Sequence, residues 1–249
     1  MLLALFLIDL AAGLVLFLPL VGRRNAGVKF YRLVFVVGGA LALLAAAAHF
    51  LALRRDLVRT DLAVVALTVV VLYLLRYPKR LVFRGSAALL AIAYCVSSFM
   101  AYHAAMAPRN AFWSIAGAAA SVALLGSVTL AMTLGHWYLV VRGMGIEPLK
   151  RLAVATLAAT VFRIAVVVAA FVAAAPEVAH QIAVREGMFF WMRAGWGLLA
   201  PLLLYPMVWG TVKIRSTMAA TGILYVDVVA VVIGEVLGAW LSAIAHLPV

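Results

Sequence analysis

Residues 112–141 read FWSIAGAAASVALLGSVTLAMTLGHWYLVV, a stretch without a single Asp, Glu, Lys or Arg. An α-helix needs about 20 predominantly apolar residues to cross the hydrocarbon core of a bilayer. A membrane β-strand would instead alternate apolar and polar residues with a period of two, and this stretch shows no such alternation. It therefore predicts a transmembrane helix.

Comparable apolar runs recur along the whole chain and predict an all-α, polytopic membrane bundle of about eight transmembrane helices. The predicted spans are 1–21, 31–53, 61–76, 85–106, 112–141, 150–175, 187–210 and 217–245. The connections are short, and the longest, 176–186, has room for a short interfacial helix. We therefore expect one transmembrane domain over residues 1–249, with any soluble catalytic or electron-carrying part on another polypeptide.

The composition excludes a soluble domain of the usual kind. The chain has 249 residues, 68% of them hydrophobic and 11% charged, with a mean hydropathy of +1.19. Soluble domains are about one quarter charged. The single cysteine, Cys95, lies inside an apolar run, so we expect no disulfide, Fe–S cluster or structural zinc site. No CxxCH motif occurs, which excludes covalent c-type haem.

The distribution of basic residues predicts the orientation. Thirteen lie near the loops after the odd-numbered spans: Arg23, Arg24, Lys29, Arg32, Arg76, Lys79, Arg80, Arg84, Arg142, Lys150, Arg151, Lys213 and Arg215. Five lie on the other side: Arg54, Arg55, Arg59, Arg109 and Arg185. By the positive-inside rule, both termini are therefore expected outside. The net charge of +12 indicates contact with anionic lipids rather than with nucleic acid.

Sixteen Arg against four Lys, with abundant Ala and Val, is typical of a GC-rich bacterial genome. We therefore expect a multi-pass protein of the bacterial cytoplasmic (inner) membrane.

Three charged residues are predicted near the bilayer midplane: Asp9, Arg163 and Asp227. Each lies about 15–18 Å from the inner end of its span at 1.5 Å per residue. Arg163 and Asp227 each lie on a helix face lined by small residues. Membrane helices pack closely at such faces. We expect Arg163 to face Asp227 or, failing that, Asp9. Such a group is either a buried ion pair that fixes helix packing or part of a proton or substrate route.

A second group is predicted near the outer interface. It consists of His49, His103, Arg193 and Glu235, each about 26–27 Å from the inner end of its span. Two level histidines on parallel helices suit a bis-histidine b-type haem, with both imidazoles as iron ligands and Arg193 beside a propionate. The same group suits a quinone head group, and simple interfacial anchoring is the alternative. Three aromatic residues would line the pocket: Tyr102, Trp191 and Trp196.

His136, in the sequence Gly135-His136-Trp137-Tyr138, lies near the inner end of its span. Interfacial anchoring and an inner-side quinone contact are both open for it. The chain contains no Walker A, HExxH, GxSxG or CxxC motif and no paired DxxxD. Their absence argues against ATPases, zinc proteases, serine hydrolases and lipid transferases.

These residues give a leading hypothesis and two alternatives. The leading hypothesis is a membrane subunit of a bacterial electron-transfer complex of the respiratory type, binding quinone, one b-type haem or both near its outer face beside other subunits. The first alternative is a transporter of a small solute, an ion or protons that uses the midplane charges. The second is a structural or assembly subunit in which the polar residues only pack helices.

Overall fold

The computed structural model describes residues 1–76, 80–106, 111–141 and 143–249, except for the side chains of residues 24 and 80–83. All secondary structure in these ranges is helical, and eight helical segments are long and apolar enough to cross a membrane. Seven are single helices: α1 (Leu2–Val21), α2 (Arg23–Leu51), α3 (Arg55–Leu74), α4 (Arg80–Met106), α5 (Ala111–Val140), α6 (Glu147–Ala173) and α10 (Thr217–Ala245). The predicted fold class, an all-helical polytopic bundle, is confirmed.

The seventh span is composite. It contains α8 (Gly187–Met192), the π-helical segment η2 (Arg193–Leu199) and α9 (Ala200–Lys213). Pro201 is the second residue of α9, two residues after the end of η2, and a proline cannot donate the backbone hydrogen bond that a regular helix requires. Single π-helical turns inside α-helices are frequent at functional sites. Before this span, α7 (Pro176–His180) and η1 (Gln181–Arg185) form the short helical connection expected from residues 176–186.

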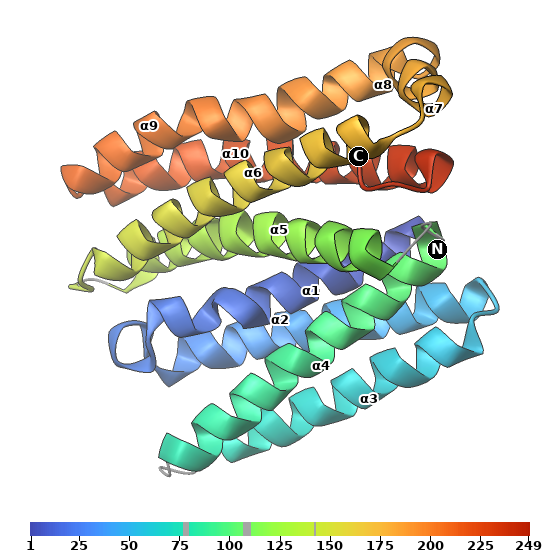
Figure 1. Ribbon diagram of the computed structural model, residues 1–249. Coiled ribbons are helices and arrows are strands. Elements are labelled where there is room, and N and C mark those ends of the chain that lie inside the picture. Colours follow the sequence, from blue (N-terminus) through green and yellow to red (C-terminus); the bar gives the residue numbers. More distant parts are fainter. Residues whose placement is uncertain (77–79, 107–110, 142) are drawn as a thin grey trace.

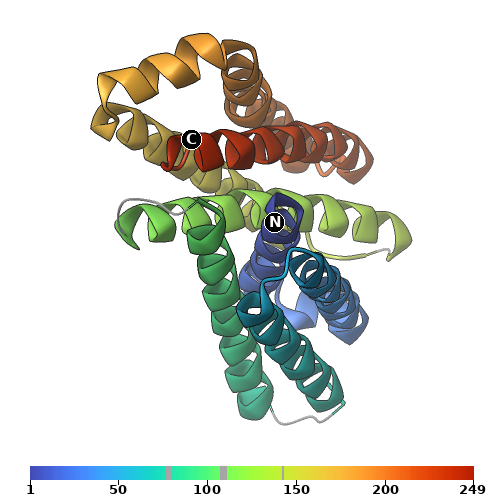
Figure 2. The same cartoon turned by 90° about the vertical axis from the view of Figure 1, so that its right-hand side faces the viewer.

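Helix α5 lies in the middle of the molecule. Helices α1 to α4 pack together on one side of it, and α6 and α8 to α10 lie on the other (Figures 1 and 2). Accordingly, α5 and α1 are the most buried spans, with 67% and 61% of their most apolar windows inside the protein. The chain termini lie at the same end of the bundle, as an even number of crossings requires (Figure 1).

Glycines allow two close helix crossings. An added Cβ on Gly13 of α1 would overlap the backbone of Gly126 in α5, and the converse also holds. Gly197 of η2 and Gly234 of α10 approach each other in the same way. Small residues at such positions let membrane helices pack backbone to backbone.

Four helices begin three or more residues earlier than hydropathy predicts. Helix α2 begins at Arg23 rather than 31, with a break at Gly27, whose φ is 77°. Helix α3 begins at Arg55 rather than 61, α4 at Arg80 rather than 85, and α6 at Glu147 rather than 150. Hydropathy detects only the lipid-embedded part of a helix, whereas backbone hydrogen bonding continues into the polar interface. These extra turns change the depths assigned to the buried charges.

Candidate functional site

A buried ion cluster joins three helical elements of the second half of the chain. Glu235 of α10 accepts from Arg163 of α6 at 3.0 Å (Nε to Oε1) and 3.1 Å (Nη2 to Oε2). It also accepts from Arg193 of η2 at 2.7 Å (Nη2 to Oε1). None of the three side chains is more than 2% exposed. The two-point contact with Arg163 is the strongest geometry for a guanidinium–carboxylate pair.

Glycines of α10 and η2 make room for the Arg193 side chain. An added Cβ on Gly197, Gly234 or Gly238 would come within contact distance of the Arg193 guanidinium. Arg193 is the first residue of the π-helical segment, which directs its side chain towards α10. The π-helical geometry and the three glycines therefore both accommodate the buried Arg193 guanidinium.

The three-membered cluster carries one excess positive charge, and Asp9 of α1 is the carboxyl group placed to balance it. Asp9, Tyr102, Arg163 and Glu235 share a cavity of about 10 Å³ with Ser121 of α5. That is close to the smallest space that holds one water molecule, about 10–15 Å³. The Ser121 hydroxyl lies close enough to interact with both Asp9 and Glu235. A serine and a water-sized cavity thus connect the Asp9 carboxyl to the ion cluster.

Several buried donors of the ion cluster have no hydrogen-bond partner within the described part of the chain. They are Arg163 Nη1, Arg193 Nε and Arg193 Nη1. A buried polar group without a partner costs about 1–3 kcal/mol, and more when it is charged. Such groups mark a place where water or a solute has polar partners to bind.

The polar network continues from Asp9 into the N-terminal half. Ser98 of α4 donates to Asp9 at 2.5 Å. Its neighbour Ser97 donates to Asp61 of α3 at 2.7 Å, and Asp61 lies 2.7 Å from Nδ1 of His49 in α2. All of these side chains are buried. Adjacent serines on α4 therefore connect two carboxyl groups, one on either side of that helix.

The predicted Arg163–Asp227 pair does not form. Glu235 is the partner of Arg163, and Asp227 is buried on α10 with Oδ1 unpaired within the described residues. The error came from the start of α6, because three extra residues add about 4.5 Å to the depth of Arg163. That moves Arg163 away from the level of Asp227 and towards that of Glu235. The second predicted neighbour, Asp9, does lie beside Arg163, across the small cavity.

The outer group is brought together only in part. Arg193 meets Glu235, and Tyr102 lines the same cavity. His49 is 0% exposed and bound to Asp61, whereas His103 bonds Ser114 at 2.7 Å. These residues do not fit a shared haem iron, because no surface of His49 is open to a ligand. The 10 Å³ cavity is also far below the roughly 300–1,000 Å³ of usual ligand pockets, so it does not fit a quinone head group.

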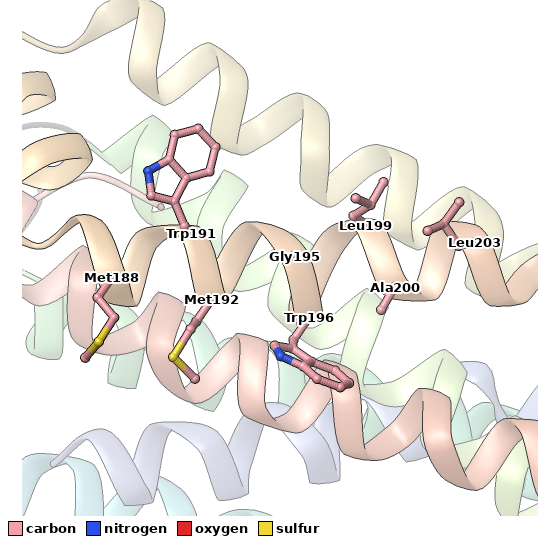
Figure 3. A pocket seen from close by; sticks show the side chains of 8 residues that line it. All are labelled: Met188, Trp191, Met192, Gly195, Trp196, Leu199, Ala200 and Leu203. Carbon is pink, nitrogen blue, oxygen red and sulfur yellow. The ribbon is translucent and has the colours of Figure 1, made fainter.

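The two predicted pocket tryptophans face outward. Trp191 and Trp196 are 66% and 50% exposed, and both line an open apolar hollow on the seventh span (Figure 3). Their neighbours there include Met188, Met192 and Leu203. This surface suits lipid contact, not a cofactor held by Arg193 and Glu235.

His136 lies near the basic end of α5, where its Nδ1 is 3.4 Å from the Tyr225 hydroxyl in an exposed contact. No group of three or more His, Cys, Asp or Glu side chains within the described ranges could hold a metal ion.

Four members of the buried network were not predicted as site residues: Asp61, Ser97, Ser98 and Ser121. Asp61 was placed at the first residue of its span, as though at the interface, whereas α3 begins six residues earlier. The charged sequence Arg54-Arg55-Asp56 was the signal that could have placed that start. The serines carry no comparable signal, because isolated Ser residues are common in apolar helices.

Comparisons with protein-family models, with curated proteins and with solved structures find no match for this chain.

Proposed function

We propose that this chain is a proton-transferring membrane protein of the transporter class, with Asp9 as the group that takes up and releases the proton. The observation that carries the proposal is the water-sized cavity that Asp9 and Ser121 share with Arg163 and Glu235, the ion pair to which Arg193 is also bound. Ionisable residues buried in membrane helices are expensive and typically mark ion pathways and proton relays.

The bonding of each member supports this assignment of roles. Arginine keeps its proton in proteins, so Arg163 and Arg193 are fixed charges. Glu235 accepts three hydrogen bonds from two guanidiniums, which favours its anionic form. Asp9 instead contacts hydroxyl groups, and a hydroxyl turns readily from donor to acceptor. Asp9 is thus the member whose protonation costs the cluster least.

Protonation of Asp9 would change the charge of the whole cluster. With Asp9 ionised, two guanidiniums face two carboxylates, whereas a neutral Asp9 leaves one positive charge in excess. A charge change of this kind biases packed helices between two arrangements, which is the usual basis of gated transport.

The part of the buried network that contains His49 and Asp61 leads towards the end of the bundle that holds the chain termini. His49 is two residues from the end of α2, and Asp61 is in the second turn of α3. Imidazole is the usual proton shuttle near neutral pH. We infer that a proton passes between His49, Asp61 and Asp9 by way of Ser97 and Ser98.

The short connections between the helices favour a second candidate function for the chain. A membrane subunit of an electron-transfer complex would use the same network to handle protons while a partner subunit carries the electrons. Copurification with a redox-active partner would favour this setting over a self-contained transporter.

Proton flux into proteoliposomes tests the proposal. The purified chain is reconstituted with a pH-sensitive dye inside, and a potassium gradient with valinomycin sets the membrane potential. We expect wild-type protein to conduct protons and Asp9→Asn to lower the flux at least tenfold.

Asp227→Asn is the matched control, because it removes another buried carboxyl group, one without an ion pair among the described residues. It should keep most of the flux, with a melting temperature close to that of Asp9→Asn. A wild-type protein without flux, or an Asp9→Asn variant with normal flux, would contradict the proposal.

A further inference from the structure

A second cavity opens at the opposite end of the N-terminal helices, next to the arginine-rich loops. It has a volume of about 820 Å³ and is bordered by α1, α2 and α4. This volume lies within the range of roughly 300–1,000 Å³ usual for small-molecule sites. None of the buried ion cluster takes part in it, so the cavity is a separate feature.

The cavity is amphipathic. Its walls are mostly apolar or small, including Val15, Leu18, Phe35 and Ala91. Its polar lining residues are Arg23, Asn25, Tyr31 and Arg84. A ligand that fills this space therefore has an apolar body and a head group that tolerates two nearby cations.

Both arginines border the same cavity. Arg23 of α2 and Arg84 of α4 line it together with Tyr31. Tyr31 itself donates to the Leu18 carbonyl oxygen at 3.2 Å, and Arg23 Nη2 reaches the Leu75 carbonyl oxygen at 3.4 Å. Two guanidiniums at one cavity, with no carboxylate among its described lining residues, are complementary to a phosphate.

The sequence explains why the space is open. Gly22 and Gly27 adopt positive φ angles of 74° and 77°, so the chain turns from α1 into α2 without side chains filling the corner. An added Cβ on Gly27 would meet nothing within 4 Å. On the α4 side, Ala87 and Ala88 present only methyl groups.

We infer that this cavity binds a phosphate-headed amphiphile, with its phosphate between Arg23 and Arg84 and its acyl or prenyl chain along the apolar wall. The cations lie at the basic end of the bundle, and anionic lipids are attracted to the basic face of a membrane protein. The inference does not depend on the proposed proton transfer.

Native mass spectrometry of the purified full-length chain tests the inference. The protein is incubated with phosphatidylglycerol, phosphatidylcholine of the same acyl chains, or inorganic phosphate alone. We expect phosphatidylglycerol to be retained at least tenfold more tightly than phosphatidylcholine. The double variant Arg23→Ala/Arg84→Ala should abolish this preference.

Two further variants separate charge from space. Lys213→Ala/Arg215→Ala removes two cations from the same end of the bundle but outside the cavity, and it should leave the preference unchanged. Ala88→Trp places a large side chain in the cavity and keeps both arginines, so it should lower phosphatidylglycerol binding. This variant tests the inference even if the arginine double variant fails to fold.

Equal retention of the two lipids, or an equal loss of preference in the Lys213→Ala/Arg215→Ala control, would overturn the inference. Tight binding of inorganic phosphate that is insensitive to Ala88→Trp would show a free-phosphate site and overturn the lipid assignment. A cavity that takes a neutral quinone in preference to phosphatidylglycerol would overturn it as well.

Discussion

Glu235 is the residue on which the buried cluster depends, because it is the acceptor for both buried arginines. Removing one partner of a buried ion pair strands the remaining charge, which typically costs 3–5 kcal/mol. Asp227 lies on the same helix and is equally buried, but it has no ion pair within the described residues. The two carboxyl groups therefore form a natural comparison between a paired and an unpaired buried acid.

We predict that Glu235→Gln lowers the free energy of unfolding in mild detergent by about 3–5 kcal/mol, because it removes the carboxylate that both guanidiniums bind. Asp227→Asn should change it by less than about 1 kcal/mol, within the usual range for a change that breaks no partner. Reversible unfolding followed by circular dichroism measures both values. Equal losses in the two variants would show that the cluster does not depend on its carboxylate.

Arg163 and Asp227 were predicted to be buried and are buried, but most partners of the polar residues were not predicted. Arg193 and Glu235 were assigned to one group from their depth, with Tyr102 as an aromatic neighbour; the structure pairs the first two and places Tyr102 beside Glu235. His49 and His103 were assigned to the same group, yet Asp61 and Ser114 hold them instead. Depth along a helix fixes one coordinate of a side chain, whereas contact also requires the helix rotation and the identity of its neighbour.

At the scale of the helical elements, the crossing of α1 and α5 is set by glycine. The backbones of Gly13 and Gly126 are in contact, so neither position has room for a Cβ. Asp9 lies one turn from Gly13, and Ser121 lies on α5 near Gly126. A shift at this crossing would therefore also move the carboxyl group and the hydroxyl that form the candidate site.

We predict that Gly126→Ala destabilises the protein by about 1–3 kcal/mol, the usual cost of overpacking, because the added methyl group must push α1 away. Gly222→Ala in α10 is the control, since a Cβ there meets nothing within 4 Å and alanine favours the helix. Thermal unfolding of the purified variants checks the difference. A melting temperature for Gly126→Ala at or above that of Gly222→Ala would contradict the close crossing.

The existence of the eight spans could be predicted, but several of their ends could not. Long apolar runs have no other stable arrangement in lipid, because every backbone polar group must be satisfied within the segment. The starts of α3 and α6 lie in charged sequence, where hydropathy gives no signal. The π-helical segment that begins at Arg193 was not predicted either, because hydropathy carries no information on helix geometry.

For the whole molecule, the arrangement places two polar sites at opposite ends of the bundle. The ion cluster and the His49 network lie towards the end that holds the termini. The amphipathic cavity lies towards the basic loops, on α1, α2 and α4. The sequence predicted the end at which each loop lies, because helix direction alternates, but it placed Asp9 and Arg163 at the bilayer midplane. It did not predict that α5 would lie between two groups of helices, since periodicity shows a buried face but not the helix that covers it.

The direction in which the bundle sits in the membrane is a prediction of the basic residues alone. Thirteen basic residues on one side against five on the other place the loops after the odd-numbered spans inside, and hence both termini outside.

Asn25 and Glu177 are both exposed. Asn25 lies in the short turn from α1 to α2 and Glu177 on α7, so the two residues lie at opposite ends of the bundle. With Cys95→Ala as background, single cysteines at these two positions should therefore react differently with an impermeant thiol reagent in intact cells. We expect Glu177→Cys to be labelled and Asn25→Cys to be labelled only after the cells are opened. Labelling of Asn25→Cys alone would show the reverse orientation. Labelling of both in intact cells would mean that the two ends are not separated by a membrane, and it would contradict the eight-span topology itself.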